Sequence, residues 1–323
     1  MTQIRKKQEV ILSMNKDSKI YVAGHAGLAG SAIVRSLESK GYRNLVCRTH
    51  SDLDLTDQAA VDKFFDEEKP EYVFLAAAKV GGIIANATYP ADYIMENLLI
   101  ECNVIKSSFQ HQVKKLLCMG SSCIYPKMCP QPIKEEYLLS APLESSNEAY
   151  ALAKIAGIKM CHHYNKQYGT QYITVMPASL YGIRDRFDLN NSHVIPALIM
   201  KMHDAKRSNK PTVQLWGSGT PLREFLYVDD MAEACTFLME TYDGHELINI
   251  GTGQEVSIRE LAETIKNVVG YDGEIEFDTS KPDGTPRKVL DNHKIENMGW
   301  KPKVNLEDGI QREYEYYLNH VLA

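Results

Sequence analysis

A glycine-rich segment near the start of the chain constrains its fold more than any other feature. Residues 24–30 read Gly-His-Ala-Gly-Leu-Ala-Gly, directly after the strand-like residues 19–23 and directly before a helical pattern at residues 31–40. In such a strand–turn–helix unit, glycines permit a tight turn and let the backbone approach a pyrophosphate that the helix N-terminus stabilises. A plain turn is the alternative, but the context favours a dinucleotide site with contacts from Gly24, Gly27, Leu28, Ala29 and Gly30.

Short β-prone segments alternate with helical patterns along the first half of the chain. Further strands are predicted at residues 45–47, 72–76, 115–119 and 172–176, and helices at residues 57–68, 91–112 and 150–168. This alternation is typical of βαβ units with right-handed crossovers. We therefore expect an α/β fold with a Rossmann-type doubly wound parallel sheet and a smaller C-terminal α/β substrate domain.

The pattern changes after residue 182. A polar and aromatic loop is expected at residues 183–191, followed by a helix at 195–206 and a strand at 213–216. Residues 246–250 are apolar enough to return to the sheet, and the tail from residue 257 shows two helical patterns around a short strand at 274–277. We expect a disordered leader at 1–18, a dinucleotide-binding domain at 19–182 with 224–256 returning to it, and a substrate-binding domain at 183–223 and 257–323.

Composition limits the classes of function. The 323 residues are 44% hydrophobic and 24% charged, as in an ordinary globular protein. A formal net charge of −6 argues against a nucleic-acid partner, and no apolar stretch is long enough for a membrane span. The seven cysteines form no C-x-x-C pair and no Cys/His group with zinc spacing, which indicates a reducing, cytoplasmic location and no bound metal.

The end of the second predicted strand indicates which dinucleotide is bound. NAD-binding folds usually place an acidic residue there for the ribose hydroxyls, whereas this chain has Cys-Arg-Thr-His-Ser at residues 47–51. Arg48 could pair with a 2′-phosphate, and His50 could donate a hydrogen bond to it. A solvated surface arginine is the alternative. The arginine and the missing acid together favour NADP(H).

Tyr150 and Lys154 are spaced to lie on one face of a predicted helix. A nearby ammonium lowers the pKa of a phenol, which suits Tyr150 to proton transfer. Such a pair also arises by chance on a solvated helix. Residues 119–123, however, read Met-Gly-Ser-Ser-Cys at the carboxyl end of a predicted strand, where open α/β sheets bind ligands. A serine hydroxyl there can donate to a substrate carbonyl, and the two motifs together predict hydride chemistry.

These motifs resemble the extended short-chain dehydrogenase/reductase family over nearly the whole chain from residue 19. More narrowly, residues 120–126, 147–150 and 191–197 are similar to those of the GDP-L-fucose synthases. Those enzymes convert GDP-4-keto-6-deoxy-D-mannose to GDP-L-fucose by 3,5-epimerisation through an enolate and NADPH-dependent reduction at C4. The resemblance thus implies NADP(H) as cofactor, this GDP-sugar as substrate, and a homodimer formed through helices 91–112 and 150–168.

The resemblance also implies residue roles. Cys123 and His193 would be the acid and base of epimerisation, Ser121 and Tyr150 would hold the C4 oxygen, and Tyr150 would protonate it during reduction. Lys154 would also bind the nicotinamide ribose. Further cofactor contacts would come from Ser51, Met119, Ser122, Pro177, Leu180 and His193, and substrate contacts from Lys201, Trp216, Arg223 and Asp283.

Simpler interpretations exist for the residues taken singly. Alone, Cys123 is more often a buried thiol, His193 a surface or capping residue, Lys201 a solvated lysine and Trp216 a core aromatic. Residues 223–230 match the R-x-F-x-Y-V-x-D pattern of the wider family, which supports diphosphate binding by Arg223 without selecting the sugar. Some fucose synthases have Arg in the glycine loop where this chain has Ala26, which leaves the preference for NADPH over NADH open.

Two other functions stand beside the synthase. One is another sugar-nucleotide epimerase or dehydratase that holds NAD tightly. Related 4,6-dehydratases carry an acidic residue soon after the serine pair, and simple 4-epimerases lack the Cys/His pair, so Cys123 followed by Ile124 argues against both. The other is a non-catalytic NADP(H)-sensing module, which characteristically loses the Tyr-Lys pair that is intact here.

Overall fold

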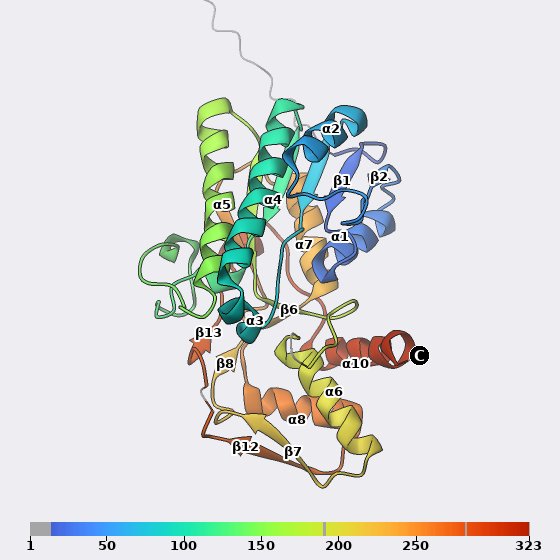
Figure 1. The fold of residues 1–323 in the computed structure, drawn as a ribbon, viewed down its shortest axis with the longest axis vertical. Coiled ribbons are helices and arrows are strands. Elements are labelled where there is room, and N and C mark those ends of the chain that lie inside the picture. The colour runs from blue at the N-terminus through green and yellow to red at the C-terminus, as the bar shows by residue number, and fades with distance from the viewer. Residues whose placement is uncertain (1–13, 190–191, 282, 323) are drawn as a thin grey trace, which may run out of the picture.

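The protein folds into a larger and a smaller lobe, arranged along its longest axis (Figure 1). The computed structural model describes residues 14–189, 192–281 and 283–322. Within these ranges the larger lobe contains a six-stranded sheet in the order β10-β5-β4-β3-β1-β2. Its strands are β1 (Ile20–Ala23), β2 (Leu45–Val46), β3 (Tyr72–Leu75), β4 (Lys115–Met119), β5 (Tyr172–Pro177) and β10 (Leu247–Ile250).

Every pairing in this sheet is parallel. The chain moves outward from β1 to β2 and then reverses through β3, β4 and β5, so the direction of winding switches between β1 and β3. In a doubly wound sheet, ligands bind beyond the carboxyl ends of the strands at such a switch point. The expected Rossmann-type fold is confirmed.

Helices cover both faces of the sheet. On one face α1 (Leu28–Ser39) packs against α7 (Val228–Thr241), and on the other α4 (Pro90–Gln110) contacts α2 (Gln58–Glu68) and α5 (Glu148–Tyr168). Figure 1 shows α4 and α5 side by side along their length. The short α3 (Ile83–Thr88) precedes α4. Among the described helices, none is long and apolar enough to cross a membrane.

The smaller lobe has its own apolar core. Its helices are α6 (Val194–Arg207), α8 (Ile258–Val269) and α10 (Leu306–Tyr316), and its strands are β7 (Thr212–Trp216), β8 (Leu222–Arg223), β11 (Val256–Ser257), β12 (Glu274–Asp278) and β13 (Arg287–Lys288). The short α9 (His293–Asn297) packs instead on β10 of the larger lobe, and its Ile295 is buried in that lobe's core. Ile199, Ile265 and Ile310 are fully buried between the helices. The pair β6 (Ser179–Tyr181) and β9 (Phe225–Tyr227) lies between the two lobes in the chain path.

The expected leader at residues 1–18 is wrong for its last residues. Met14 is buried against the core of the larger lobe, and its carbonyl accepts a hydrogen bond from the Tyr42 hydroxyl at 3.2 Å. Ser18 is buried as well. Residues 14–18 are therefore held by tertiary packing, whereas the remainder of the expected leader, residues 1–13, lies outside the described residues.

Two other differences concern helices. The sequence did not predict α7, in which Val228, Met231, Cys235 and Leu238 are all buried. A helix with so much of its circumference buried lacks the one-sided apolar pattern that reveals an exposed helix. In the tail, the two expected helical patterns and the strand between them are present as α8, β12 and α10, and the structure adds the short α9 and a π-helical turn at Tyr317–Val321.

A buried carboxylate joins three segments of the chain beside the predicted diphosphate site. Glu224 lies between β8 and β9 and is 2% exposed. One of its oxygens accepts the N–H groups of Thr252 and Gly253 at 2.6 and 2.7 Å, and the other accepts that of Leu290 at 2.8 Å. The glutamate next to Arg223 therefore ties β8 to the segments that follow β10 and β13.

We predict that Glu224→Ala lowers the free energy of unfolding by about 2–3 kcal/mol, because several backbone N–H donors lose their acceptor. Glu224→Gln should lower the free energy of unfolding by less, because its amide oxygen still accepts hydrogen bonds from backbone N–H groups. Denaturant titration followed by circular dichroism measures both. The exposed Glu263→Ala in α8 is the matched control, and equal stability of the two alanine variants would contradict the prediction.

Candidate functional site

The glycine segment forms a close-packed turn between β1 and α1. Gly24 has a φ of +84°, and a Cβ placed on it would lie 2.7 Å from the Ala77 nitrogen. A Cβ on Gly30 would collide with the Gly24 carbonyl. The Gly27 N–H donates to that carbonyl at 3.1 Å, and Gly27 is the N-cap of α1. A side chain at position 24 or 30 would therefore collide with the backbone, and the turn could not keep this conformation.

The N-terminus of α1 is suited to bind an anion. Leu28, Ala29 and Gly30 form its first turn, no side chain caps it, and that turn carries no acidic residue. The first N–H groups of a helix lack intrahelical acceptors and carry the positive end of its dipole. This end of α1 therefore offers unopposed backbone donors at the place where the sequence predicts a pyrophosphate.

The loop after β2 holds the residues expected to select NADP(H). The Arg48 guanidinium forms an ion pair with Glu68 of α2 and also donates to the Cys47 carbonyl at 2.8 Å. His50 is exposed, and the Ser51 hydroxyl lies 2.8 Å from that of Thr49. A 2′-phosphate would thus have to compete with Glu68 for Arg48, whereas His50 and Ser51 face solvent.

An acid that the sequence analysis did not consider lies in the same loop. The Asp52 carboxylate accepts both the N–H and the hydroxyl of Thr49, at 3.1 and 2.6 Å. These bonds hold the pKa of Asp52 below its usual range, so the carboxylate is charged. Asp52 therefore stabilises the loop through Thr49. It lies beyond the end of β2, and that strand end is where NAD-binding folds carry their acidic residue.

The remaining predicted cofactor contacts are placed by the strands. Met119 ends β4 and Pro177 ends β5, while Leu180 lies in β6 and Ser122 opens a short 3₁₀ helix at Ser122–Ile124. Since β4 and β5 are neighbouring parallel strands, their carboxyl ends meet at one edge of the sheet. The same edge receives the end of β1 and therefore the glycine turn.

Ser121, Cys123, Tyr150 and Lys154 are brought together at this edge. The Ser121 hydroxyl lies 3.0 Å from the Cys123 sulfur and also hydrogen-bonds to Tyr150. Tyr150 interacts electrostatically with Lys154 one helical turn along α5 and with Cys123. Ser121 in extended conformation caps the 3₁₀ helix that carries Cys123, so the local turn after β4 directs both side chains toward α5.

The environment of Tyr150 differs from the expectation in one respect. Burial is the largest influence and raises the pKa of the phenol well above its usual range, while Lys154 lowers it and Cys123 and Glu101 raise it. The ammonium of Lys154 acts as the sequence suggests, but it does not dominate. Tyr150 therefore keeps its proton at neutral pH and can donate it.

His193 lies apart from this group, at the N-cap of α6. Its Nδ1 is 3.7 Å from the Asp185 carboxylate, which is itself buried. The nearby Asp185 carboxylate raises the pKa of His193 against the opposing effect of burial. Within the described residues, His193 makes no hydrogen bond to Ser121, Cys123 or Tyr150, so it forms a pair with Asp185 and not a joined set with those three.

The predicted substrate residues lie in the smaller lobe. Trp216 ends β7 and exposes 61% of its surface. Arg223 in β8 interacts electrostatically with Asp283, whose carboxylate accepts the N–H and hydroxyl of Ser218 at 2.6 and 2.8 Å. Lys201 in α6 lines a hollow of about 250 Å³ beside β7. The Lys281 ammonium lies 5.8 Å from the centroid of the Trp216 ring.

Three functional residues were missed by the sequence analysis. Lys288 in β13 stands opposite Arg223 and interacts with the Cys123 thiol, and burial lowers its pKa. In the part of the chain that the structure describes, its ammonium has no ion-pair partner. Glu101 of α4 pairs with Lys154, and Asp185 pairs with His193. No sequence spacing links these residues to their partners, because each lies on a different element.

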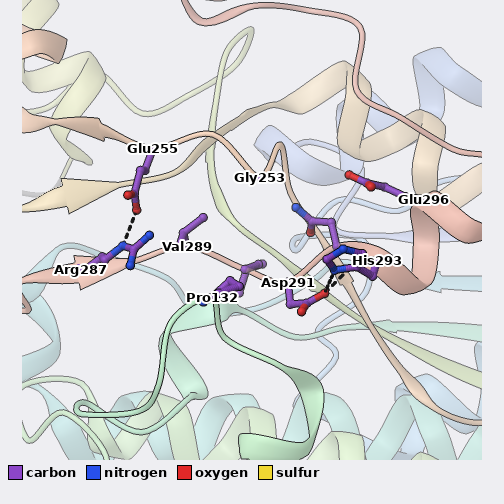
Figure 2. A pocket seen from close by; sticks show the side chains of 10 residues that line it. Pro132, Gly253, Glu255, Arg287, Val289, Asp291, His293 and Glu296 are labelled. Carbon is purple, nitrogen blue, oxygen red and sulfur yellow. Dashed lines mark hydrogen bonds and ion pairs between the residues drawn. The ribbon is translucent and has the colours of Figure 1, made fainter.

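A separate hollow of about 240 Å³ lies near β13 (Figure 2). Its charged side chains are paired with each other: Arg287 with Glu255 at 2.7 Å and His293 with Asp291 at 2.7 Å. None of the predicted site residues lines it. Among the described residues, no group of three or more His, Cys, Asp or Glu side chains could hold a metal ion, here or elsewhere.

The sequence profile of the NAD dependent epimerase/dehydratase family matches residues 20–251, well over half of the chain. The chain belongs to this family. Its relatives in the family include the putative GDP-L-fucose synthase 2 of Arabidopsis thaliana, 59% identical over 96% of this chain and 94% of the relative. The GDP-L-fucose synthase of Escherichia coli K12 is 52% identical over 94% and 97% of the two chains.

A solved structure of the family agrees with these matches. It is a GDP-L-fucose synthetase from Naegleria fowleri bound to NADP, with a TM-score of 0.89, 28% identity, and coverage of 97% of both chains. The resemblance drawn from the glycine, serine and tyrosine motifs is thereby confirmed.

We predict that Gly24→Ala weakens NADPH binding at least tenfold, because a Cβ at position 24 meets the backbone of Ala77 and displaces the turn that approaches the pyrophosphate. Gly41→Ala is a matched control, since Gly41 has the same φ of +84° but no neighbouring atoms within 4 Å. Fluorescence titration with NADPH gives both dissociation constants. Equal weakening in the two variants would show that backbone strain alone is responsible.

A second prediction concerns His193. Asp185→Asn removes the negative charge that raises the pKa of His193, so that pKa should fall by about one unit or more. Titration of the imidazole carbon resonances by NMR measures the shift. His293, whose pKa is raised by Asp291, is an internal control that should not move. An unchanged His193 would mean that Asp185 does not act on it.

Proposed function

We propose that this protein is a GDP-L-fucose synthase: it epimerises GDP-4-keto-6-deoxy-D-mannose at C3 and C5 and then reduces the C4 ketone. The observation that carries the proposal is the contact set of Ser121, Cys123, Tyr150 and Lys154 at the sheet edge. It joins a thiol suited to carbon deprotonation with a phenol suited to ketone reduction. The synthases among the relatives, 52–59% identical, make an NAD-dependent epimerase or dehydratase the less favoured alternative.

The residues present fit NADPH as cofactor. The side-chain-free turn at Gly24 and Gly30 and the uncapped start of α1 suit the pyrophosphate. Arg48, His50 and Ser51 would meet the 2′-phosphate, and Lys154 the nicotinamide ribose. Met119, Ser122, Pro177 and Leu180 would line the nicotinamide end at the strand termini. When bound, NADPH supplies the hydride for the reduction.

Epimerisation requires a base on one face of the sugar and an acid on the other, because each stereocentre loses a proton and regains it from the opposite side. Cys123 is the proposed base, and Lys288 is a basic residue that interacts electrostatically with it. His193 is the proposed acid, since Asp185 favours its protonated form. The enolate that forms between these steps carries its charge on the C4 oxygen, where Ser121 and Tyr150 donate hydrogen bonds.

Reduction uses the same oxygen. As hydride reaches C4, the oxygen gains a full negative charge, and Tyr150 gives it the phenolic proton. Its raised pKa keeps that proton in place until the alkoxide, a stronger base, develops. Lys154 then stabilises the phenolate that remains, until solvent returns a proton to it.

The GDP part of the substrate would lie along the smaller lobe. Arg223 has the bidentate geometry for a diphosphate, and Trp216 presents an exposed ring for stacking on guanine. Asp283 would accept hydrogen bonds from the guanine or ribose, although its carboxylate also holds Ser218. Lys201 lies further along α6 and would add a positive charge.

We also propose that the protein is a cytoplasmic homodimer. Exposed apolar side chains gather on the paired helices α4 and α5, where Met95, Leu99, Leu152 and Tyr168 expose 59%, 37%, 42% and 50% of their surface. Covering such a face with a second copy would bury it. Each of the seven cysteines is described and free, which supports a reducing compartment.

The proposed division of labour is tested by separating the two reactions. Tyr150→Phe should lower NADPH consumption by about 10²–10⁴-fold, the usual worth of a general acid, while C3 and C5 protons still exchange with deuterated solvent. Cys123→Ser should depress that exchange. Mass spectrometry and NMR of the sugar measure deuterium, and NADPH absorbance measures reduction.

Matched controls are available in the same chain. Tyr168→Phe changes an exposed tyrosine on the same helix, and Cys129→Ser changes a half-buried thiol that also interacts with Lys288. Both should exchange and reduce like the wild type. Normal exchange in Cys123→Ser with loss of reduction would refute the assignment of Cys123 as base, and an absence of NADPH consumption by the wild type would refute the synthase itself.

A further inference from the structure

Besides Tyr150, Lys154 interacts with a protein carboxylate that has no part in the proposed reaction. Its ammonium lies 2.8 Å from an oxygen of Glu101 in α4, and the two side chains are only 3% and 2% exposed. In the proposed mechanism Lys154 acts on Tyr150. Its ammonium, however, forms an ion pair with a buried carboxylate on another helix. Burying a carboxylate costs several kcal/mol unless it is paired, so this arrangement requires a reason.

The contact between α4 and α5 is shaped around this carboxylate. The Glu101 carboxylate itself rests against Gly157 of α5, and a Cβ at position 157 would collide with one of its oxygens. Glycine within a helix costs roughly 0.5–1 kcal/mol relative to alanine. Glycine at position 157 thus lowers the helix propensity of α5 but leaves room for the Glu101 carboxylate. The close contact with Gly157 keeps that carboxylate beside Lys154.

The charged and titratable groups around this pair come from several elements. Tyr150 and Cys161 belong to α5, Cys118 to β4, Cys123 to the 3₁₀ helix and Cys102 to α4. Burial raises the pKa of Cys161 and of Cys102, so these thiols are neutral. Among the described residues that act on Lys154 or Tyr150, Glu101 supplies the one carboxylate.

The charge of Glu101 changes what Lys154 does to Tyr150. A lone ammonium beside a phenol stabilises the phenolate and promotes loss of the proton, which suits an enzyme that oxidises alcohols. The Glu101 carboxylate, 2.8 Å from that ammonium, acts on the phenol in the opposite direction and offsets part of this effect. The phenol then keeps its proton, which is the form that a ketone reductase needs before hydride arrives.

We propose that Glu101 is a positioning residue that fixes the Lys154 ammonium and, by offsetting part of its charge at the phenol, helps burial to keep Tyr150 protonated and the site poised for reduction. The direction of catalysis rests on the proposed function, but the state of Tyr150 does not. A contribution of Glu101 to helix packing alone would leave the ionisation of Tyr150 unchanged, and this separates the two roles experimentally.

The first experiment titrates Tyr150 without substrate. Phenolate absorbance in the near ultraviolet is recorded against pH for the wild type and for Tyr150→Phe, and their difference reports Tyr150 alone. In the wild type, this signal should appear only above the pH at which exposed tyrosines ionise. Its appearance at lower pH would overturn the proposal without any variant of Glu101 and regardless of the substrate.

The second experiment removes the charge. In Glu101→Gln, compared with the same variant carrying Tyr150→Phe, the phenolate signal should move down by about one pH unit or more. With substrate and NADPH, the alkaline limb of the reduction rate should move down with it, so that one unit above the new limb the rate falls roughly tenfold below its plateau. The KM for the GDP-sugar should stay within about twofold.

Two further variants distinguish charge from packing. Glu96→Gln on the same helix breaks the exposed ion pair with Lys79 and should leave both titrations as in the wild type. Gly157→Ala keeps every charge but displaces the carboxylate, and it should shift the Tyr150 signal in the same direction as Glu101→Gln. A lower melting temperature in Glu101→Gln or Gly157→Ala with an unchanged Tyr150 titration would show a packing role and refute the proposal.

Discussion

The strands of the main sheet all run parallel, so their carboxyl ends meet at one edge. Side chains at the ends of β1, β4 and β5 therefore lie along the same edge, although they are far apart in the sequence. The glycine turn, the Ser121–Cys123 segment and the first turns of α5 all follow from this constraint. The smaller lobe is connected to this edge by the buried Glu224, which accepts hydrogen bonds from Thr252 after β10 and from Leu290 after β13.

Within the site, the balance of charge is set by residues that do not touch the reacting carbon atoms. Glu101 faces Lys154, Asp185 faces His193, and Lys288 faces Cys123. Each side chain proposed to transfer a proton is thus accompanied by one charged residue. In the proposed function, these different environments suit the thiol, the imidazole and the phenol to different steps.

The parts that the sequence predicted are those encoded by local spacing. Glycines at 24, 27 and 30, and a tyrosine four residues before Lys154, are patterns of one turn or one helix face. Glu101, Asp185 and Lys288 are functional only through partners on other elements, and a single sequence carries no signal for such pairs. The helix α7 was missed because it is buried around most of its surface, and Met14 because its packing is tertiary. The ion pair of Arg48 with Glu68 was hidden for the same reason.

The strand β10 joins the sheet only after the chain has made its first excursion into the smaller lobe. During synthesis, the larger lobe therefore lacks an edge strand until residue 250 has left the ribosome. The core of the smaller lobe waits longer still, since Ile310 and Tyr314 complete it. Neither lobe can therefore complete its core as an independent N-terminal unit, and the two lobes have to finish folding together.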